Sequence, residues 1–352
     1  MKFISIQKKN WSEGLRKSKK IYQLFGHIKD ENGCFIRTLD DDKMPDMQCS
    51  NSIMSAKSVL FPQTESILDA TLDTSSKDHH IMKRVQKQYS PRAVVGIKPY
   101  DAKAIQLLRL NFDNKDYSDP YWCDAYDATT FIGLGINEPE SLDFSTSVNA
   151  NPFGEEGLDV LLADLGDQYL AKVLTAKGEI FVKACGFESV ADEKHSSSVF
   201  DILKKQACDS IVSKVDTNEL KNKSILDLYE ADFWNDIAFS CINCGTCTFV
   251  CPTCWCFDIQ DETKRKSTTR FRNWDTCMSN LFTLHASGHN PRDTKNHRVR
   301  QRFMHKLKYF LDKYDKGIMC VGCGRCIKSC PVNIDIREVI SLMNSYEKQD
   351  NL

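Results

Sequence analysis

The sequence predicts an α+β protein with a mixed α/β domain over residues 1–189, a helical bridge over 190–236 and a helical domain over 237–352. Short apolar stretches between turn residues fill the first part of the chain, a pattern typical of alternating strands and short helices. Stretches with helical periodicity replace them after about residue 190. Two cysteine-rich runs follow in the last third of the chain. A chain of 352 residues is long enough to bury a core in each domain.

The N-terminal domain alternates strand and helix signals. We expect strands at residues 21–28, 34–38, 93–97, 129–134, 158–163, 169–174 and 179–182. The first two are joined by residues 29–33, which are typical of a hairpin, and the last two are expected to pair across Ala176-Lys-Gly178. Ser12 and Asp101 are expected to cap helices that end at Lys20 and Asn111.

The later part of the chain has helical periodicity. The clearest helix is expected at residues 300–314, where Phe303, Leu307, Phe310, Leu311 and Tyr314 recur at helical spacing before Gly317. Strand signals are not recognisable there, so a helical ferredoxin-type fold is predicted rather than the small βαβ type.

The cysteine runs repeat one spacing. They comprise Cys241, Cys244, Cys247 and Cys251-Pro252, then Cys320, Cys323, Cys326 and Cys330-Pro331. This is the C-x2-C-x2-C-x3-C-P pattern of cubane [4Fe–4S] clusters. A zinc site needs four ligands, usually as two pairs, and does not call for a third cysteine followed by Cys-Pro. The sequence therefore predicts two [4Fe–4S] clusters, with structural zinc as the alternative.

The ligands are expected to cross between the runs, because in two-cluster ferredoxins the fourth cysteine of each run binds the other cluster. The first cluster is then assigned Cys241, Cys244, Cys247 and Cys330, and the second Cys251, Cys320, Cys323 and Cys326. Between Cys251 and Cys320 lie 68 residues, so the two runs must enclose a sizeable insert.

Eight further cysteines lie outside the runs. Cys254, Cys256 and Cys277 can be explained as buried packing residues. The alternative is a functional role: a third metal site, a persulfide relay or a ligand exchange with Cys251. The others show no mutual spacing and are expected to be structural: Cys34, Cys49, Cys123, Cys185 and Cys208. His289 fits a structural histidine, with hydrogen bonding to a cluster sulfur as the alternative.

Charge and hydropathy exclude several classes of protein. The formal net charge is −1, yet residues 261–330 hold 16 Lys/Arg against 6 Asp/Glu. We attribute this excess to compensation of anionic clusters and expect no nucleic-acid partner. The N-terminus does not resemble a signal peptide, and no run is apolar enough for a membrane span, so a cytoplasmic protein without direct membrane insertion is predicted. Without a Gly-x-Gly-x-x-Gly motif after a strand or a P-loop, we predict no flavin or nucleotide site. Because the cysteine spacing favours iron–sulfur clusters, we predict no zinc site either.

Longer motifs resemble one group of redox subunits. They are Leu60-Phe-Pro-Gln63 through Glu65, Val95-Gly-Ile-Lys-Pro99, residues 133–152, Phe233-Trp234, Cys241 through Asp258, Trp274-Asp-Thr-Cys277 and Gly288-His-Asn290. The chain is similar, over most of its length, to beta subunits of cytoplasmic nickel–iron hydrogenases (sulfhydrogenases) and to the A subunits of anaerobic sulfite reductases. The resemblance implies electron transfer between a flavin subunit that uses NAD(P)H and a catalytic partner.

The chain departs from that family at four positions in its N-terminal domain. The resemblance implies a further iron–sulfur site there, with one cysteine after the Pro99 motif and three in the later loop. This chain has Tyr100, Ile136, Asp143 and Ser145 instead. We therefore expect the scaffold to persist without that cluster.

The expected function is that of an iron–sulfur electron-transfer subunit in a multi-subunit oxidoreductase. It would relay single electrons from or to a flavin/NAD(P)H- or ferredoxin-linked subunit, with a catalytic redox subunit of hydrogenase-like or sulfite/sulfur-reductase-like type as its other partner. No catalytic acid, base or nucleophile is recognisable in the chain. The alternative is a self-contained reductase of a sulfur compound that uses Cys254, Cys256, Cys277 or an unseen cofactor in the N-terminal domain.

Overall fold

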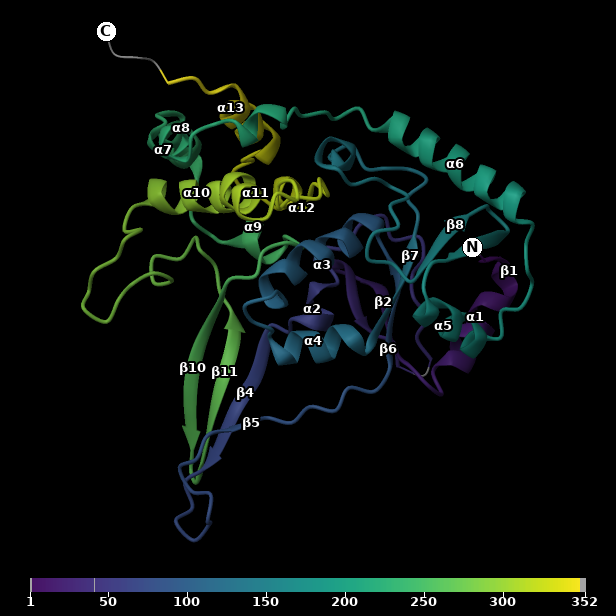
Figure 1. Cartoon of the computed structure of the whole chain (residues 1–352), viewed down its shortest axis with the longest axis horizontal. Helices are drawn as coiled ribbons and strands as arrows, with labels where there is room; N and C mark the ends of the chain where they lie inside the picture. The colour runs from purple at the N-terminus through teal and green to yellow at the C-terminus, as the bar shows by residue number, and fades with distance from the viewer. Residues whose placement is uncertain (1, 41, 349–352) are drawn as a thin grey trace.

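A computed structural model describes residues 2–40 and 42–348, and Figure 1 shows a sheet domain beside a helical region. The helical region contains the two cysteine runs. The main sheet has seven strands in the order β1-β9-β8-β7-β6-β2-β3. Its strands are β1 (Lys2–Gln7), β2 (Gln23–Asp30), β3 (Gly33–Thr38), β6 (Arg92–Ile97), β7 (Thr129–Leu134), β8 (Val160–Asp164) and β9 (Gln168–Val173). The central strands β2, β6, β7 and β8 are parallel, and β3, β9 and β1 are antiparallel to their neighbours.

Helices cover both faces of this sheet, which is why every residue of β6 and β7 is buried. On one face Val94 and Phe131 pack with α3 (Pro99–Phe112) and α4 (Pro120–Asp127). On the other face Val95 and Ile132 pack with α1 (Lys8–Ser18) and α5 (Ala176–Cys185). Alternate residues of each strand therefore contribute to two separate cores.

The expected strands and helices of this domain are largely confirmed, with three corrections. The first helix begins at Lys8 rather than at Ser12. The helix expected to be capped by Asp101 begins at Pro99, so Asp101 lies in its first turn and is not its cap. The strand expected at residues 179–182 is wrong, because these residues lie in α5, and β9 pairs instead with β8. Ala176-Lys-Gly178 is the first turn of a helix that is capped by the hydroxyl of Thr175. Gly178 is required there, since a Cβ would collide with the carbonyl oxygen of Asp159.

Cys34 and Cys49 form a disulfide that their spacing did not suggest. The loop after β3 folds back on that strand, where the amide of Ile53 donates to the carbonyl of Cys34 at 2.9 Å. The loop thereby brings together two cysteines that are 15 residues apart.

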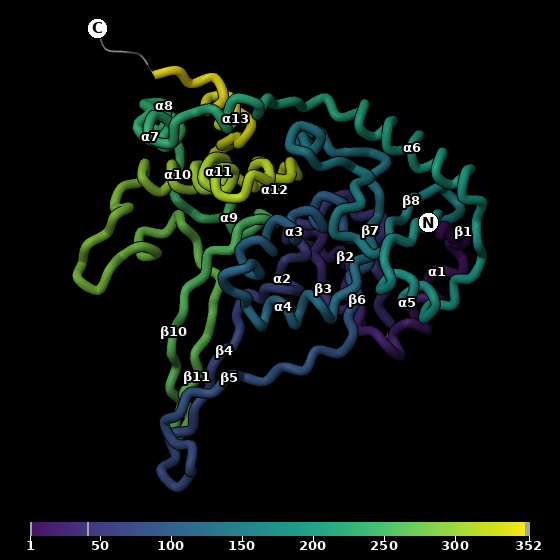
Figure 2. The backbone as a smooth tube through the Cα atoms, viewed as in Figure 1, coloured from purple at the N-terminus to yellow at the C-terminus, as the bar shows by residue number. Residues whose placement is uncertain are grey.

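The chain then passes along the outside of the molecule into the cysteine-rich region (Figure 2). The helical segments from residue 193 onward are α6 (Glu193–Ser210), η2 (Asn218–Lys221), α7 (Ile225–Glu230), α8 (Phe233–Ser240), α9 (Thr246–Phe249), α10 (Lys295–Met304), η3 (His305–Tyr309), α11 (Phe310–Tyr314), α12 (Arg325–Lys328) and α13 (Ile336–Ser345). The predicted helix at residues 300–314 is present as α10, η3 and α11, and η3 is a π-helical segment. Two short helical segments, α2 (Lys57–Leu60) and η1 (Ser145–Val148), lie in the N-terminal domain.

The insert between the cysteine runs contains a hairpin, although no strand signal was recognised in this part of the sequence. Strands β10 (Phe257–Lys264) and β11 (Ser267–Trp274) pair with each other, and β11 pairs with β4 (Thr64–Thr71) of the N-terminal domain. With β5 (Lys83–Arg84) they form a four-stranded sheet that extends away from the rest of the molecule (Figure 1). The charged residues of β10 are mostly exposed, and β11 has two arginines, so the usual hydrophobic pattern of a strand is weak.

Arg272 holds the ribbon to the N-terminal domain. Its guanidinium is buried and forms ion pairs with Glu65 and Asp119. Close by, the indole of Trp274 donates to the carbonyl of Phe61 at 3.0 Å. The motif at residues 60–65 is therefore a docking site for the insert. The predicted domain boundaries at residues 189 and 236 remain a prediction. The contact of the insert with the N-terminal domain spans both boundaries.

In the part of the chain that the structure describes, no helix combines the length and the apolar character needed to cross a membrane.

Replacing Arg272 tests this junction. Arg272→Ala leaves Asp119 without its ion pair and Glu65 with Lys87 alone, so we expect the free energy of unfolding to fall by about 3–5 kcal/mol. Chemical denaturation followed by tryptophan fluorescence measures the change. Arg270→Ala is a matched control on the same strand, because the Arg270–Asp261 pair is exposed and should matter little. Equal effects of the two substitutions would contradict this role of Arg272.

Candidate functional site

The two cysteine runs adopt the same local conformation. Each places its second and third spacer residues in the left-handed region: Asn243 and Gly245 in the first run, Gly322 and Gly324 in the second. Such conformations suit glycine and, less often, asparagine. A short helix, α9 or α12, begins directly after Gly245 or Gly324. Each run therefore forms a tight loop that ends in a helical turn.

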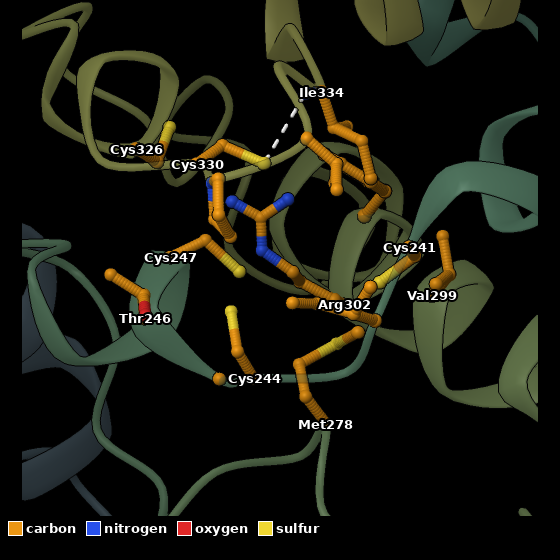
Figure 3. Close-up of a pocket in the computed structure, with 15 residues that line it drawn as sticks. Cys241, Cys244, Thr246, Cys247, Met278, Val299, Arg302, Cys326, Cys330 and Ile334 are labelled. Atoms are coloured by element: carbon orange, nitrogen blue, oxygen red, sulfur yellow. Dashed lines mark hydrogen bonds between the residues drawn. The ribbon is translucent and has the colours of Figure 1, made fainter.

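The four cysteines assigned to the first cluster line one cavity. Cys241, Cys244 and Cys247 come from the first run, and Cys330 comes from the second. Figure 3 shows the guanidinium of Arg302, from α10, among their sulfur atoms. Met278, Val299 and Phe303 provide apolar walls, and Cys244 is exposed to solvent.

The four cysteines assigned to the second cluster line another cavity. Cys251 closes it from the first run, while Cys320, Cys323 and Cys326 come from the second. Cys326 also lines the first cavity, so the two cavities adjoin one another. Folding thus exchanges the last cysteine of each run between the two cavities.

Two of the buried cations beside the cysteines have no carboxylate partner among the described residues. Within residues 2–40 and 42–348, neither Arg302 nor Lys306 forms an ion pair with an acidic side chain, and Nε of Arg302 has no hydrogen-bond partner. Lys306 donates instead to Sγ of Cys251 at 3.3 Å and to the carbonyl of Met319 at 3.0 Å. A buried charge left without a counterion costs several kcal/mol. The cavities therefore suit a strongly anionic group.

The pKa values of these cations follow from the same surroundings. Burial acts to lower the pKa of Arg302, but the nearby sulfurs of Cys247 and Cys326 outweigh it and raise this pKa. Burial likewise opposes protonation of Lys306, while Cys251 and Cys254 raise its pKa above the usual range. Both side chains therefore remain cationic at neutral pH.

A third cation, Lys57, orders the backbone at the end of the first run. Its ammonium donates to the carbonyls of Cys251 at 2.9 Å and Cys254 at 3.0 Å, and lies 4.2 Å from the ring centroid of Trp274. Burial lowers the pKa of Lys57 to about 8, against the raising effect of the Cys254 and Cys251 sulfurs. Lys57 is part of the N-terminal domain, so that domain helps to shape the site.

The residues present fit [4Fe–4S] clusters. Each cavity offers four thiols, which is the usual ligand set of such clusters. Burial raises the pKa of Cys323 to about 12, so this ligand needs metal coordination or a cation to lose its proton at neutral pH. Arg302 and Lys306 supply compensating positive charge.

The N-terminal domain also supports the second run through a buried ion pair. Arg325, between Cys323 and Cys326, donates to both carboxylate oxygens of Asp101 at 2.6 Å and to the carbonyl of Ser52 at 2.7 Å. The bidentate contact fixes the loop against α3.

Of the four positions where related chains are expected to have cysteine, Tyr100 lies against the second run, with its ring centroid 5.7 Å from the guanidinium of Arg325. Tyr100, Ile136, Asp143 and Ser145 are buried. The segment that holds the last two packs on the second run, because a Cβ on Gly322 would lie 2.5 Å from the amide nitrogen of Ser145. The loss of an N-terminal cluster remains a prediction.

The three additional cysteines of interest also come together. Cys254, Cys256 and Cys277 line a third cavity with His305, Arg302 and Lys306. Burial, together with Lys306 and Arg292, lowers the pKa of His305 to about 4, so its ring is neutral at neutral pH. His289, in contrast, is exposed and packs its ring on His285, away from the three cavities.

Sequence reasoning attributed the basic excess of residues 261–330 to compensation of anionic clusters, but it did not single out Arg302, Lys306 or His305. Arg302 and Lys306 are four residues apart on one helix, which places both on the face that meets the cysteines. Two basic residues among the apolar positions of that helix were the available signal. Lys57 carried no comparable signal, because it is distant in sequence and reaches the site only through folding.

A family model described as a 4Fe-4S dicluster domain matches residues 240–334, which span both runs. The fold and the match define an iron–sulfur electron-transfer protein. The chain is 30% identical over 253 residues to sulfhydrogenase 2 subunit beta of Pyrococcus furiosus, covering 70% of this chain and 72% of that protein. It therefore belongs to the sulfhydrogenase beta-subunit family, and the expected resemblance is confirmed. No solved structure matches the chain.

The buried His27 should make stability depend on pH. Burial and, secondarily, Lys98 and Arg325 lower the pKa of His27 to about 3 from 6.5, so the folded chain keeps the ring neutral. Below pH 6.5 the unfolded chain binds a proton that the folded chain does not, and stability falls as the pH decreases toward 3. In that range the stability of wild type relative to His27→Gln should decrease by about 1.4 kcal/mol per pH unit.

Chemical denaturation at several pH values between 5 and 8 measures this difference. His195→Gln is a matched control, because His195 is exposed at the start of α6. It should retain the wild-type pH dependence. A His27→Gln curve parallel to that of wild type would contradict the role of His27.

Proposed function

We propose that this cytoplasmic chain holds two [4Fe–4S] clusters and relays single electrons within a hydrogenase-like or sulfite/sulfur-reductase-like complex. Its partners would be a catalytic redox subunit and a flavin-containing, NAD(P)H- or ferredoxin-linked subunit. The relative from Pyrococcus furiosus is named as the beta subunit of a sulfhydrogenase, which supports such an assembly. A bound [4Fe–4S] cluster would supply one-electron chemistry, and the side chains of this chain do the rest.

The observation that carries the proposal is the exchange of the last cysteine between the runs. Cys330 lines the cavity of the first run, and Cys251 lines that of the second. We assign Cys241, Cys244, Cys247 and Cys330 to the first cluster and Cys251, Cys320, Cys323 and Cys326 to the second. This arrangement supports adjacent redox centres, as in two-cluster ferredoxins.

Exposure suggests where electrons enter or leave. Cys244 is exposed, whereas Cys251 and Cys320 are buried. Phe239 and Ile242, on either side of Cys241, are 85% and 62% exposed, an unusual position for large apolar side chains. We propose that a redox subunit docks at this surface and exchanges electrons through the first cluster.

Iron and acid-labile sulfide counts after anaerobic purification test the ligand assignment. Cys244→Ser should remove about four iron atoms per chain and one signal from the EPR spectrum of the reduced protein. Cys323→Ser should do the same at the second site. Cys208→Ser is the control, because Cys208 lies on α6 and outside both cavities. Stoichiometric zinc with little iron in the wild type would refute the electron-transfer function.

The charge of Arg302 should set the potential of the first site. Reduction adds negative charge there, and a buried guanidinium stabilises the reduced form. Arg302→Met should therefore lower the reduction potential of one EPR-active centre in a redox titration. Arg302→Lys keeps the charge and serves as the control, with a smaller shift expected. Equal potentials in wild type and Arg302→Met would show that this charge does not tune the site.

A further inference from the structure

The third cavity is shaped by the backbone pairing of the hairpin, which places its cysteines side by side. Strands β10 and β11 pair Phe257 with Trp274, and the amide of Asp275 donates to the carbonyl of Cys256 at 3.0 Å. The two strand ends thereby bring Cys277 beside Cys256. Cys254 reaches the same cavity from the end of the first run. The hairpin thus unites three thiols from two distant segments.

The surroundings of this cavity match those of the two cluster sites. Arg302 lines both it and the first cavity, and Lys306 lines both it and the second. Each cation therefore lies between the third cavity and one of the two cluster cavities. Neutral thiols would not compensate the positive charges of Arg302 and Lys306.

His305 completes a set of four metal-binding side chains. It lies on the same helical stretch, three residues after Arg302, and it lines the cavity. Its ring packs edge-on against Trp255, with 6.1 Å between the ring centroids. Imidazole replaces thiolate in some iron–sulfur centres, so three cysteines and one histidine form an acceptable ligand set.

A multinuclear group suits this cavity better than a single ion. Among the residues that the structure describes, no group of three or more His, Cys, Asp or Glu side chains lies close enough together to hold one metal ion. The two cluster cavities share this property, and a cubane would need its ligands spread around its corners rather than around one point. Structural zinc, in contrast, draws four ligands around one point.

We propose that Cys254, Cys256, Cys277 and His305 bind a third iron–sulfur cluster, of the [4Fe–4S] type. The inference goes beyond the two-cluster relay and adds a centre next to both sites. Arg302 and Lys306 provide positive charge to it as well as to its neighbours. It also gives β10 and β11 a role in cofactor binding, in addition to their pairing with β4.

The test uses the full chain, purified anaerobically, with iron, sulfide and zinc measured together with EPR of the reduced protein. Wild type should contain about 12 iron atoms per chain. The double variant Cys256→Ser/Cys277→Ser should lose about four of them and keep the signals of the two other clusters. The control is again Cys208→Ser, which should keep the full iron content.

Three results would overturn the proposal. The first is a wild-type protein with only about eight iron atoms per chain, and the second is the same iron content together with one zinc per chain. The third is a double variant that contains as much iron as wild type. If the double variant fails to fold, His305→Ala decides, because loss of one ligand should alter the EPR signal of the third cluster only. An unaltered spectrum in that variant would also overturn the proposal.

The same measurements separate this inference from the proposed function. Failure of Cys244→Ser and Cys323→Ser to remove iron would refute the two-cluster relay. Failure of the Cys256→Ser/Cys277→Ser variant alone would refute only the third site.

Discussion

Positive charge inside the cysteine-rich region is the constraint on which the structure depends. Arg302, Lys306 and Lys57 are all buried, and each faces sulfur atoms or backbone carbonyls rather than carboxylates. Such groups are unfavourable in a protein interior unless an anion compensates them. The cations and the expected clusters therefore stabilise each other. Two of these cations come from one helix, and the third comes from the N-terminal domain, so both parts of the chain contribute to the site.

The cysteine spacing predicted which thiols would come together, because the spacing itself encodes a loop around a cubane. Cys241 and Cys330 are 89 positions apart, yet they line one cavity, as their places in the two runs suggested. The grouping of Cys254, Cys256 and Cys277 was only one of several alternatives that the sequence left open. It depends on the pairing of β10 with β11, which the charged composition of this exposed ribbon concealed.

The fold of the N-terminal domain was predictable where hydrophobic runs are short and buried. The limits of β7 were predicted to the residue, and β6 to within one residue. The segment at residues 179–182 failed because Ala176-Lys-Gly178 resembles a turn, whereas Thr175 caps a helix there. Contacts between distant segments, such as Arg325 with Asp101 or Arg272 with Glu65, have no local signature. Tertiary packing alone determines them.

The pairing of β4 with β11 has a consequence for how the protein is made. Glu65 lies opposite Arg272 in this sheet, so β4 is synthesised about 200 residues before its partner strand. During translation β4 must remain without its β11 partner, with only the short β5 beside it, while the rest of the N-terminal domain folds. The ribbon closes only after the first cysteine run and the hairpin have emerged. Lys57, just before β4, can contact the first cysteine run only after that run has been synthesised. The cysteine site is therefore completed late in the synthesis and folding of the chain.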